Sequence, residues 1–138
     1  MVTEDYVSFE TAMLLKEKGF DCPCKVWYSE YTSQFFRGEK YTSIEFDDHN
    51  RFNENYKFLC YAPTLQRAMK WLRKEHGLHC HSDYDIVLGW YCQVTSLTET
   101  VEYDYEEMKH YHPDKDNGFS SPEEACEEAI RYCLKNLI

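Results

Sequence analysis

The chain has 138 residues, of which 43% are hydrophobic and 17% aromatic, and its formal net charge is −10. This composition excludes a largely disordered chain, and the negative charge argues against nucleic acid or anionic membranes as partners, because both attract basic residues. No apolar run approaches the roughly 18 residues that cross a bilayer. The acidic start, MVTEDYVSFE, has no hydrophobic signal segment, so we expect a cytoplasmic protein whose seven cysteines are thiols.

The N-terminal part of the sequence predicts a helix followed by strands. Ser8 is a suitable N-cap for a helix that ends near Lys18, because its hydroxyl can accept from an N–H group of the first turn. Gly19 can adopt the left-handed conformation after the helix, and Phe20 can fold back on Leu15. Aromatic and β-branched segments then predict three strands, at residues 25–31, at 34–36 or 41–46, and at 57–61.

Residues 62–78, APTLQRAMKWLRKEHGL, form the clearest predicted element. Thr64 fits the N-cap, and Gly77 fits the left-handed residue that follows the last turn. Apolar side chains recur at helical spacing and form one stripe, which comprises Leu65, Ala68, Met69 and Leu72. Because an apolar strand leads straight into this helix, we expect a sheet to lie under the stripe.

After Gly77 the sequence predicts further strands. One strand begins at residues 78–81, residues 82–85 form a turn, and residues 86–95 are the most strand-like run in the chain. Alternation assigns one face of this run to the core, namely Ile86, Leu88, Trp90, Cys92 and Val94. Residues 99–111 are acidic and aromatic, which predicts an exposed edge strand protected by its charges.

The last predicted helix begins at Ser121, with Pro122 at its first position and Glu124 completing a capping box. Its apolar stripe comprises Cys126, Ala129, Ile130, Cys133, Leu134 and Leu137. The predicted element order is therefore α-β-β-β-α-β-β-(β)-α. Strands in hairpin runs between helices predict an α+β fold, as a single domain over residues 1–138 with a mostly antiparallel sheet packed by about three helices.

Two longer patterns resemble a known group of proteins. They are Y-A-P-T-x-x-x-A-x-x-W-L at residues 61–72 and F-x-S-P-E-E-A-x-x-x-A-I at residues 119–130. Over roughly residues 56–138 the chain resembles small uncharacterised proteins of tailed phages and of prophages in gut bacteria, grouped as phage αβα-sandwich-like domains. The resemblance implies a fold, a phage or prophage origin and the cytosol of a bacterial host, and it implies no activity.

Two short motifs place metal-binding side chains close together. They are Cys-Pro-Cys at residues 22–24 and His-Cys-His at residues 79–81. A zinc site needs four ligands in tetrahedral array, which would be Cys22, Cys24, His79 and His81. Structural zinc motifs, however, usually have two residues between paired cysteines, whereas here there is one. The alternative is a connector and a strand whose two histidines share an exposed face.

Little in the sequence points to catalysis. Four further cysteines lie on predicted apolar faces: Cys60, Cys92, Cys126 and Cys133. A buried free cysteine behaves as a small hydrophobe, whereas a catalytic cysteine requires a lowered pKa beside a base. The chain has no Gly-rich phosphate loop, no G-x-S-x-G motif and no H-E-x-x-H motif. The sequence therefore favours a protein that is not an enzyme and has no cofactor.

Two charged surfaces are candidates for protein contact. One is acidic and rich in tyrosine, and comprises Glu102, Tyr103, Asp104, Tyr105, Glu106 and Glu107. The other is a basic face of the central helix, and comprises Arg67, Lys70, Arg73 and Lys74. Tyrosine is enriched where proteins bind proteins, and the basic face would suit an acidic partner or a second copy of the chain. The alternative for both surfaces is an ordinary solvated face.

The leading hypothesis is a small acidic protein of phage or prophage type that acts as a non-enzymatic protein-interaction module, alone or as a homodimer. Its partner is expected to be a protein, with a basic host protein as one option. In a second hypothesis, the acidic segment mimics nucleic acid and inhibits a host defence protein. The third hypothesis comes from another class, and is a metal-binding domain or metal-dependent enzyme that uses the Cys/His cluster.

Overall fold

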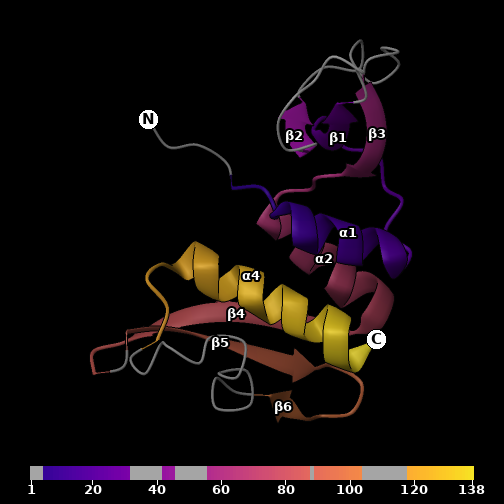
Figure 1. The fold of residues 1–138 in the computed structure, drawn as a ribbon. Coiled ribbons are helices and arrows are strands. Elements are labelled where there is room, and N and C mark those ends of the chain that lie inside the picture. The colour runs from indigo at the N-terminus through magenta and orange to yellow at the C-terminus, as the bar shows by residue number, and fades with distance from the viewer. Residues whose placement is uncertain (1–4, 32–41, 46–55, 88, 104–117) are drawn as a thin grey trace. The chain divides into compact units, whose positions relative to one another are not determined.

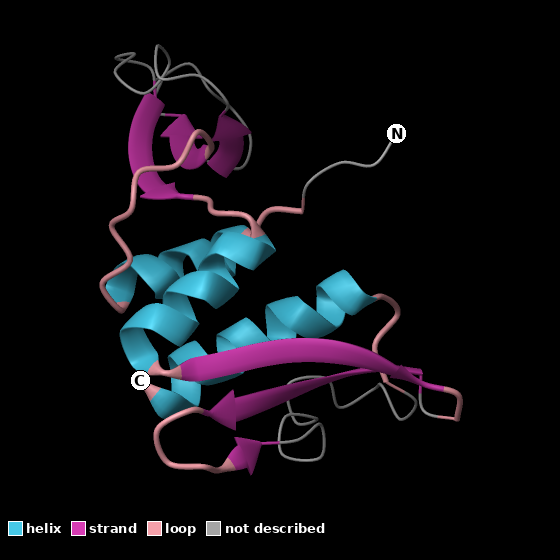
Figure 2. Ribbon diagram, turned by 180° about the vertical axis from the view of Figure 1, so that it is seen from behind, coloured by secondary structure: helices cyan, strands magenta, loops and turns pink. Residues whose placement is uncertain are grey.

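The computed structural model describes residues 5–31, 42–45, 56–87, 89–103 and 118–138, without the side chains of Tyr31, Tyr56 and residues 42–45. The fold is α+β, and the described elements follow the predicted order. Their strands are shared between two three-stranded antiparallel sheets, whereas the sequence had placed them in one (Figures 1 and 2). The chain divides into two compact units, one spanning Tyr6–Pro63 and the other Met1–Asp5 with Thr64–Ile138.

In the first unit, helix α1 (Phe9–Glu17) accompanies a sheet of β1 (Trp27–Tyr31), β2 (Thr42–Glu45) and β3 (Tyr56–Tyr61), in the order β2-β1-β3. Strand β2 falls within the second of its two predicted positions, and residues 34–36 lie outside the described residues. Lys16 Nζ donates to the carbonyl of Leu59 at 2.6 Å, which joins α1 to β3. The largest buried side chains of this unit include Val7, Leu15, Val26 and Trp27.

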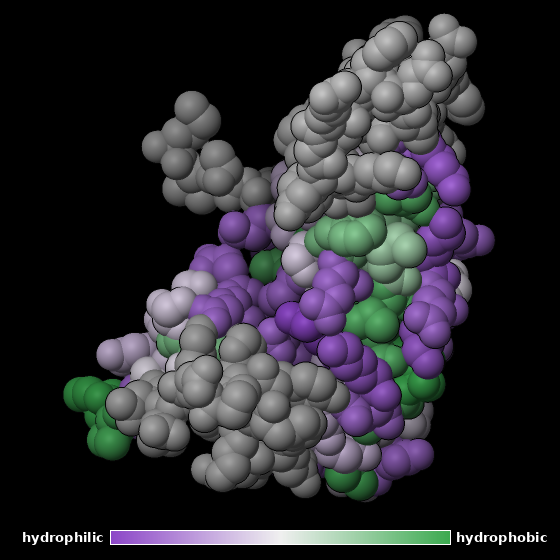
Figure 3. Space-filling model, viewed as in Figure 1, coloured by the Kyte–Doolittle hydropathy of each residue, from purple (hydrophilic) through white to green (hydrophobic). Residues whose placement is uncertain are grey.

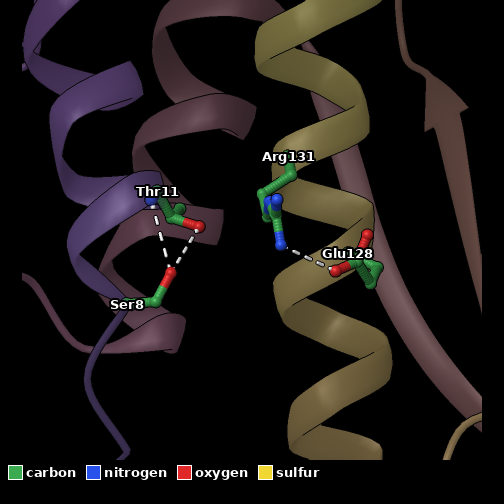
Figure 4. A network of polar contacts seen from close by, with 4 residues as sticks. All are labelled: Ser8, Thr11, Glu128 and Arg131. Atoms are coloured by element: carbon green, nitrogen blue, oxygen red, sulfur yellow. Dashed lines mark hydrogen bonds and ion pairs between the residues drawn. The ribbon is translucent and has the colours of Figure 1, made fainter. Parts of the chain in front are cut away.

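Both ends of α1 have the predicted caps. The hydroxyl of Ser8 accepts from the N–H of Thr11 at 3.3 Å and donates to the Thr11 hydroxyl at 3.1 Å (Figure 4). At the other end, Gly19 has a φ of 100°, and the N–H of Phe20 donates to the carbonyl of Leu15 at 2.9 Å. This is the Schellman arrangement, in which a left-handed glycine lets the chain return to the last turn.

The second unit packs two helices on one sheet. The sheet has the order β4 (Leu78–Asp85), β5 (Gly89–Ser96) and β6 (Glu102–Tyr103). Helix α4 (Pro122–Tyr132), which continues as a π-helical turn over Cys133–Leu137, lies across β4 and β5 (Figure 1). Helix α2 (Leu65–His76) packs against β4 and α4. Their buried side chains include Leu72, Leu78, Cys80, Cys92, Val94, Ile130 and Leu134.

Helix α2 begins and ends where the sequence predicts. The Thr64 hydroxyl accepts from the N–H of Arg67 at 3.2 Å. Gly77 follows the last turn with a φ of 64°, and its N–H donates to the carbonyl of Arg73 at 3.1 Å. Of the predicted stripe, Leu65, Ala68 and Leu72 are buried and Met69 is half-buried. Local cap chemistry therefore identified both ends of this helix correctly.

Helix α4 also starts as predicted, but its buried face is wider than its apolar stripe. The Ser121 hydroxyl accepts from the N–H of Glu124 at 3.1 Å, and the Glu124 carboxylate accepts from the N–H of Ser120 at 3.2 Å, one residue before the N-cap. Of the predicted stripe, Ala129, Ile130, Cys133 and Leu134 are buried, and Cys126 and Leu137 are half-buried. Ala125, Glu128 and Tyr132 are also buried. Glu128 is only 3% exposed, and its Oε1 accepts from Arg131 Nη1 at 3.0 Å (Figure 4).

The predicted turn at residues 82–85 is wrong. Strand β4 continues to Asp85, which pairs with Gly89, so the turn follows Asp85 and includes Ile86 and Val87. Ile86 is consequently 90% exposed and not on the buried face, and Leu88 lies outside the described residues. The prediction for Cys92 and Val94 is confirmed, since both are fully buried. Of the predicted edge strand at 99–111, β6 covers Glu102–Tyr103, and residues 104–111 lie outside the description.

That the two units form one domain stays a prediction, which the tryptophans can test. Trp27 is the single tryptophan of Tyr6–Pro63, and Trp71 and Trp90 belong to the other unit. In the W71F/W90F variant, fluorescence reports Trp27 alone, while far-UV circular dichroism also reports the helices of the second unit. We expect both signals to show one urea midpoint, because a single domain unfolds cooperatively. Two separate midpoints would contradict a single domain.

A second prediction concerns the buried Glu128–Arg131 pair. Arg131→Met should lower the free energy of unfolding by about 2 kcal/mol, because a buried carboxylate loses its cation. The double variant E128Q/R131M should recover much of that loss, since it removes the buried charge. Urea unfolding measures both, with Lys135→Met as the control at an exposed position of the following turn. Equal stabilities of R131M and K135M would show that the pair contributes nothing.

Candidate functional site

The turn between β4 and β5 is built by two residues with turn chemistry. Asp85 Oδ1 accepts from the N–H of Val87 at 2.7 Å, which is the bond of an Asx turn. Gly89, the residue paired with Asp85, has a φ of 86°, which a residue with a side chain rarely adopts. A three-residue hairpin loop that ends at a left-handed glycine is a common connection between antiparallel strands. Asp85 and Gly89 therefore stabilise the turn where the strand register places it.

The turn carries apolar side chains into solvent. Ile86 is 90% exposed, Val87 is 80% exposed and the adjacent Tyr84 is 56% exposed, and we call these three side chains the hairpin tip. A hydrophobic group projects where the β4–β5 hairpin ends (Figure 3). Turns usually carry Gly, Asn, Asp or Ser, and single exposed apolar residues are ordinary. Three of them together on a defined turn are a candidate contact surface.

Tyr84 of the hairpin tip packs against Trp90 of β5. The rings of Tyr84 and Trp90 meet edge to face, with centroids 5.1 Å apart and planes at 61°. The carbonyl of Trp90 accepts from the N–H of Phe119 at 2.8 Å, which joins the hairpin to the segment before α4. Asp83, which is exposed, and Asp85 place negative charge beside the tip. The arrangement suits an apolar pocket whose rim carries positive charge.

Of the predicted acidic surface, Glu102 and Tyr103 lie in the described residues, and Asp104, Tyr105, Glu106 and Glu107 lie outside them. Glu102 is exposed and accepts from Gln93 Nε2 at 3.4 Å. Tyr103 is half-buried, and its ring lies 5.9 Å from that of Tyr132. Part of the Tyr103 side chain is therefore buried against the protein itself. Nucleic-acid mimicry by this segment stays a prediction.

The predicted basic face is present on α2. All four side chains are exposed, namely Arg67, Lys70, Arg73 and Lys74. The stripe of Leu65, Ala68 and Leu72 lies buried on the same helix, which accounts for this exposure. Binding of an acidic partner or a second copy by this face stays a prediction.

The proposed metal ligands belong to different units. Cys22 and Cys24 lie in the connector before β1, where the Cys24 thiol donates to the carbonyl of Cys22 at 3.3 Å. His79 and His81 share one face of β4, as predicted, with ring centroids 5.5 Å apart and planes at 22°. Among the described residues, no three His, Cys, Asp or Glu side chains gather in a way that could hold a metal ion. This part of the chain gives no support to the metal hypothesis.

The sequence did not reveal that four cysteines gather where α4 and its last turn pack on β4 and β5. Cys80 and Cys133 are buried with their sulfurs 3.5 Å apart, and the Cys126 thiol donates to the Ser82 hydroxyl at 3.4 Å. The contact with Cys133, together with burial, holds the pKa of Cys80 well above its usual value. Burial raises the pKa of Cys92 to about 12. The raised pKa of Cys80 and of Cys92 disfavours the thiolate, which is the form that acts as a nucleophile.

A pocket of about 320 Å³ lies where α2 and α4 begin. Helix N-termini often bind anions through N–H groups that have no partner within the helix. Here several of these N–H groups already have a partner. The N–H of Leu65 donates to the carbonyl of Asp5 at 2.9 Å, and the hydroxyls of Thr64 and Ser121 each accept from one further N–H of their helix. Pro122 has no N–H group to offer. The carboxylates of Asp5 and Glu123 also line the pocket, so its chemistry does not favour a phosphate.

The chain was compared with protein families, curated proteins and solved structures. No protein-family model matches the chain, and neither a curated protein nor a solved structure does. The resemblance to phage proteins stays a prediction. None of the described helices has the length and apolarity required to cross a membrane.

The burial of the cysteines predicts the order in which they react. We expect iodoacetamide at mildly alkaline pH to modify Cys22 and Cys24, which are half-buried in a connector, before it modifies Cys80 and Cys92. The buried pair is inaccessible, and its raised pKa leaves few thiolates. Peptide mass spectrometry of the native protein over time measures the order, with urea-unfolded protein as the control. Faster modification of Cys92 than of Cys22 in the native protein would contradict this interpretation.

Proposed function

We propose that this protein is a non-enzymatic protein-interaction module whose hairpin tip inserts into an apolar pocket of a partner protein. The exposure of Ile86 and Val87, at 90% and 80%, is the observation that carries this proposal. Each would contribute about 2 kcal/mol on full burial, so a partner that covers both gains substantial affinity. Nothing in the fold of the hairpin itself requires apolar side chains at these two positions, because Asp85 and Gly89 make the turn.

Two contacts restrain the hairpin tip. The Asp85 carboxylate accepts from the N–H of Val87, and the ring of Tyr84 packs against that of Trp90. Binding would therefore order few additional groups, and preorganisation of this kind lowers the entropic cost of association. This supports a docking role for the tip.

The charge beside the tip indicates the chemistry of the partner. Asp83 and Asp85 flank the apolar side chains, and the whole chain carries a net charge of −10. A basic rim around the partner's pocket would complement this field and accelerate encounter, whereas an acidic rim would oppose it. A basic host protein, as expected from the sequence, fits this description.

Binding experiments with tip variants test the proposal. The double variant I86S/V87S should weaken binding to a partner isolated from the native host by about 10-fold or more, because two side chains no longer fill the pocket. Leu97→Ser is the matched control, since Leu97 is 56% exposed in the turn between β5 and β6. Partners are captured on immobilised protein, and their affinities are then measured with purified components by calorimetry.

The thermal stability of I86S/V87S should remain close to that of the original chain, because the altered side chains are exposed. The proposal is contradicted if every isolated partner binds I86S/V87S as tightly as it binds the L97S control.

A further inference from the structure

Strand β4 is a long, regular strand at the edge of its sheet. In the order β4-β5-β6, one side of β4 pairs with β5, and the other side pairs with no strand in the described part of the chain. All eight residues of β4 pair with β5 without a register shift. Its sequence, LHCHSDYD, contains neither proline nor lysine, and its two aspartates protect the edge only against a strand that places carboxylates opposite them. Such a strand is suited to pair with another strand.

Hydrogen bonds of the neighbouring strands show which groups of β4 face outward. The carbonyl of Trp90 accepts from Phe119, and the N–H of Ser96 donates to the carbonyl of Val101, so Trp90 and Ser96 face away from β4. In an antiparallel ladder, the residues opposite them then face away from β5. These residues are Tyr84 and Leu78, and alternation adds Cys80 and Ser82. The N–H of Tyr84 accordingly meets the Asp83 carboxylate, at 2.8 Å, and not β5.

The other four residues of β4 are polar, and their two kinds lie at opposite ends of the strand. His79, His81, Asp83 and Asp85 alternate along the strand and share one face, with the imidazoles at one end and the carboxylates at the other. Burial, His81 and the exposed Arg73 together lower the pKa of His79, which favours its neutral form. The edge of β4 therefore carries imidazoles at its start and carboxylates at its end.

We propose that β4 pairs with β4 of a second copy of this chain, antiparallel and about a two-fold axis at Ser82. The outward groups of Cys80 would then bond those of the partner's Tyr84, and the N–H of Tyr84 would exchange the Asp83 carboxylate for the carbonyl of the partner's Cys80. Ser82 would lie opposite the partner's Ser82. On the polar face, His81 lies opposite the partner's Asp83, and His79 lies opposite the partner's Asp85. The two sheets would join into one continuous sheet of six strands.

The order of imidazoles and carboxylates selects this register over its neighbours. An axis at His81 would place His81 opposite its own copy, and an axis at Asp83 would place two carboxylates opposite each other. Cross-strand side chains that hydrogen-bond stabilise antiparallel pairing, and like charges directly opposite destabilise it. The axis at Ser82 places each histidine, whose ring N–H can donate, opposite an aspartate that accepts, and brings no two carboxylates directly opposite.

This inference does not rest on the proposed function. Pairing at the edge uses main-chain groups of Cys80, Ser82 and Tyr84, whereas partner docking uses the side chains of Ile86 and Val87. The variant I86S/V87S should consequently keep the dimer. A dimer that is lost in I86S/V87S but kept in an edge variant would assign the interface to the hairpin tip and overturn the pairing.

A charge exchange tests the register directly. Analytical ultracentrifugation at low salt should show a dimer of the full chain. His81→Glu places a carboxylate opposite the partner's Asp83 and should raise the dimer dissociation constant by about 10-fold or more, and Asp83→Lys should also weaken the dimer. The double variant H81E/D83K restores opposite charges across the axis and should dimerise nearly as well as the original chain. Circular dichroism establishes that each variant is folded, and Asp83, being exposed, tolerates substitution.

Hydrogen exchange supplies a second readout. The N–H groups of Cys80 and Ser82 should gain protection as protein concentration rises, while that of Leu97, which donates to Gly77 at 2.7 Å, should not change. The proposal is overturned by a chain that stays monomeric at all accessible concentrations. It is equally overturned by a dimer that H81E leaves intact, or by a double variant that does not regain the dimer.

Discussion

The antiparallel register of β4 and β5 is the constraint from which the features of the second unit follow. Eight residue pairs run from Leu78↔Ser96 to Asp85↔Gly89 without a shift. Side chains of a strand alternate between two faces, so this register sends Cys80, Cys92 and Val94 to one face, where they are buried. It sends His79, His81 and the two aspartates to the other face. A slip of one residue would move the buried side chains to the exposed face and the polar side chains into the core. The cost of that exchange fixes the register.

The same register places the apolar residues of the turn in solvent. Because Asp85 pairs with Gly89, Ile86 and Val87 between them do not join the ladder. They are therefore exposed although their sequence suits a buried strand. Among the described residues they are the most exposed large hydrophobic side chains, and they follow the edge strand β4 in the chain.

The buried cysteines show that the position of a thiol in the fold determines whether it is reactive. In sequence, a thiol is a candidate nucleophile or metal ligand, and seven of them invite both interpretations. Burial favours the neutral thiol, which raises the pKa of Cys92 to about 12 and that of Cys60 to about 11. The close contact of Cys80 with Cys133 acts in the same direction. In this environment the sulfurs fill space in a core, as other small apolar groups would.

The helix caps, the order of the elements and the α+β class were determined by the sequence alone, because each depends on neighbouring residues, whereas the ends of β4 and β5 were not. Thr64, Gly77, Ser121 and the Gly19–Phe20 pair act within one helical turn, and strand segments show their own period. Only the tertiary structure decided that the strands form two sheets, that the hairpin turns after Asp85, that Glu128 is buried, and that Cys80 meets Cys133. These depend on which segments pack together: residues 80 and 133 meet only when α4 lies on β4. The same limit applied to the candidate site, since Ile86 and Val87 are exposed only because pairing of Asp85 with Gly89 excludes them from the sheet.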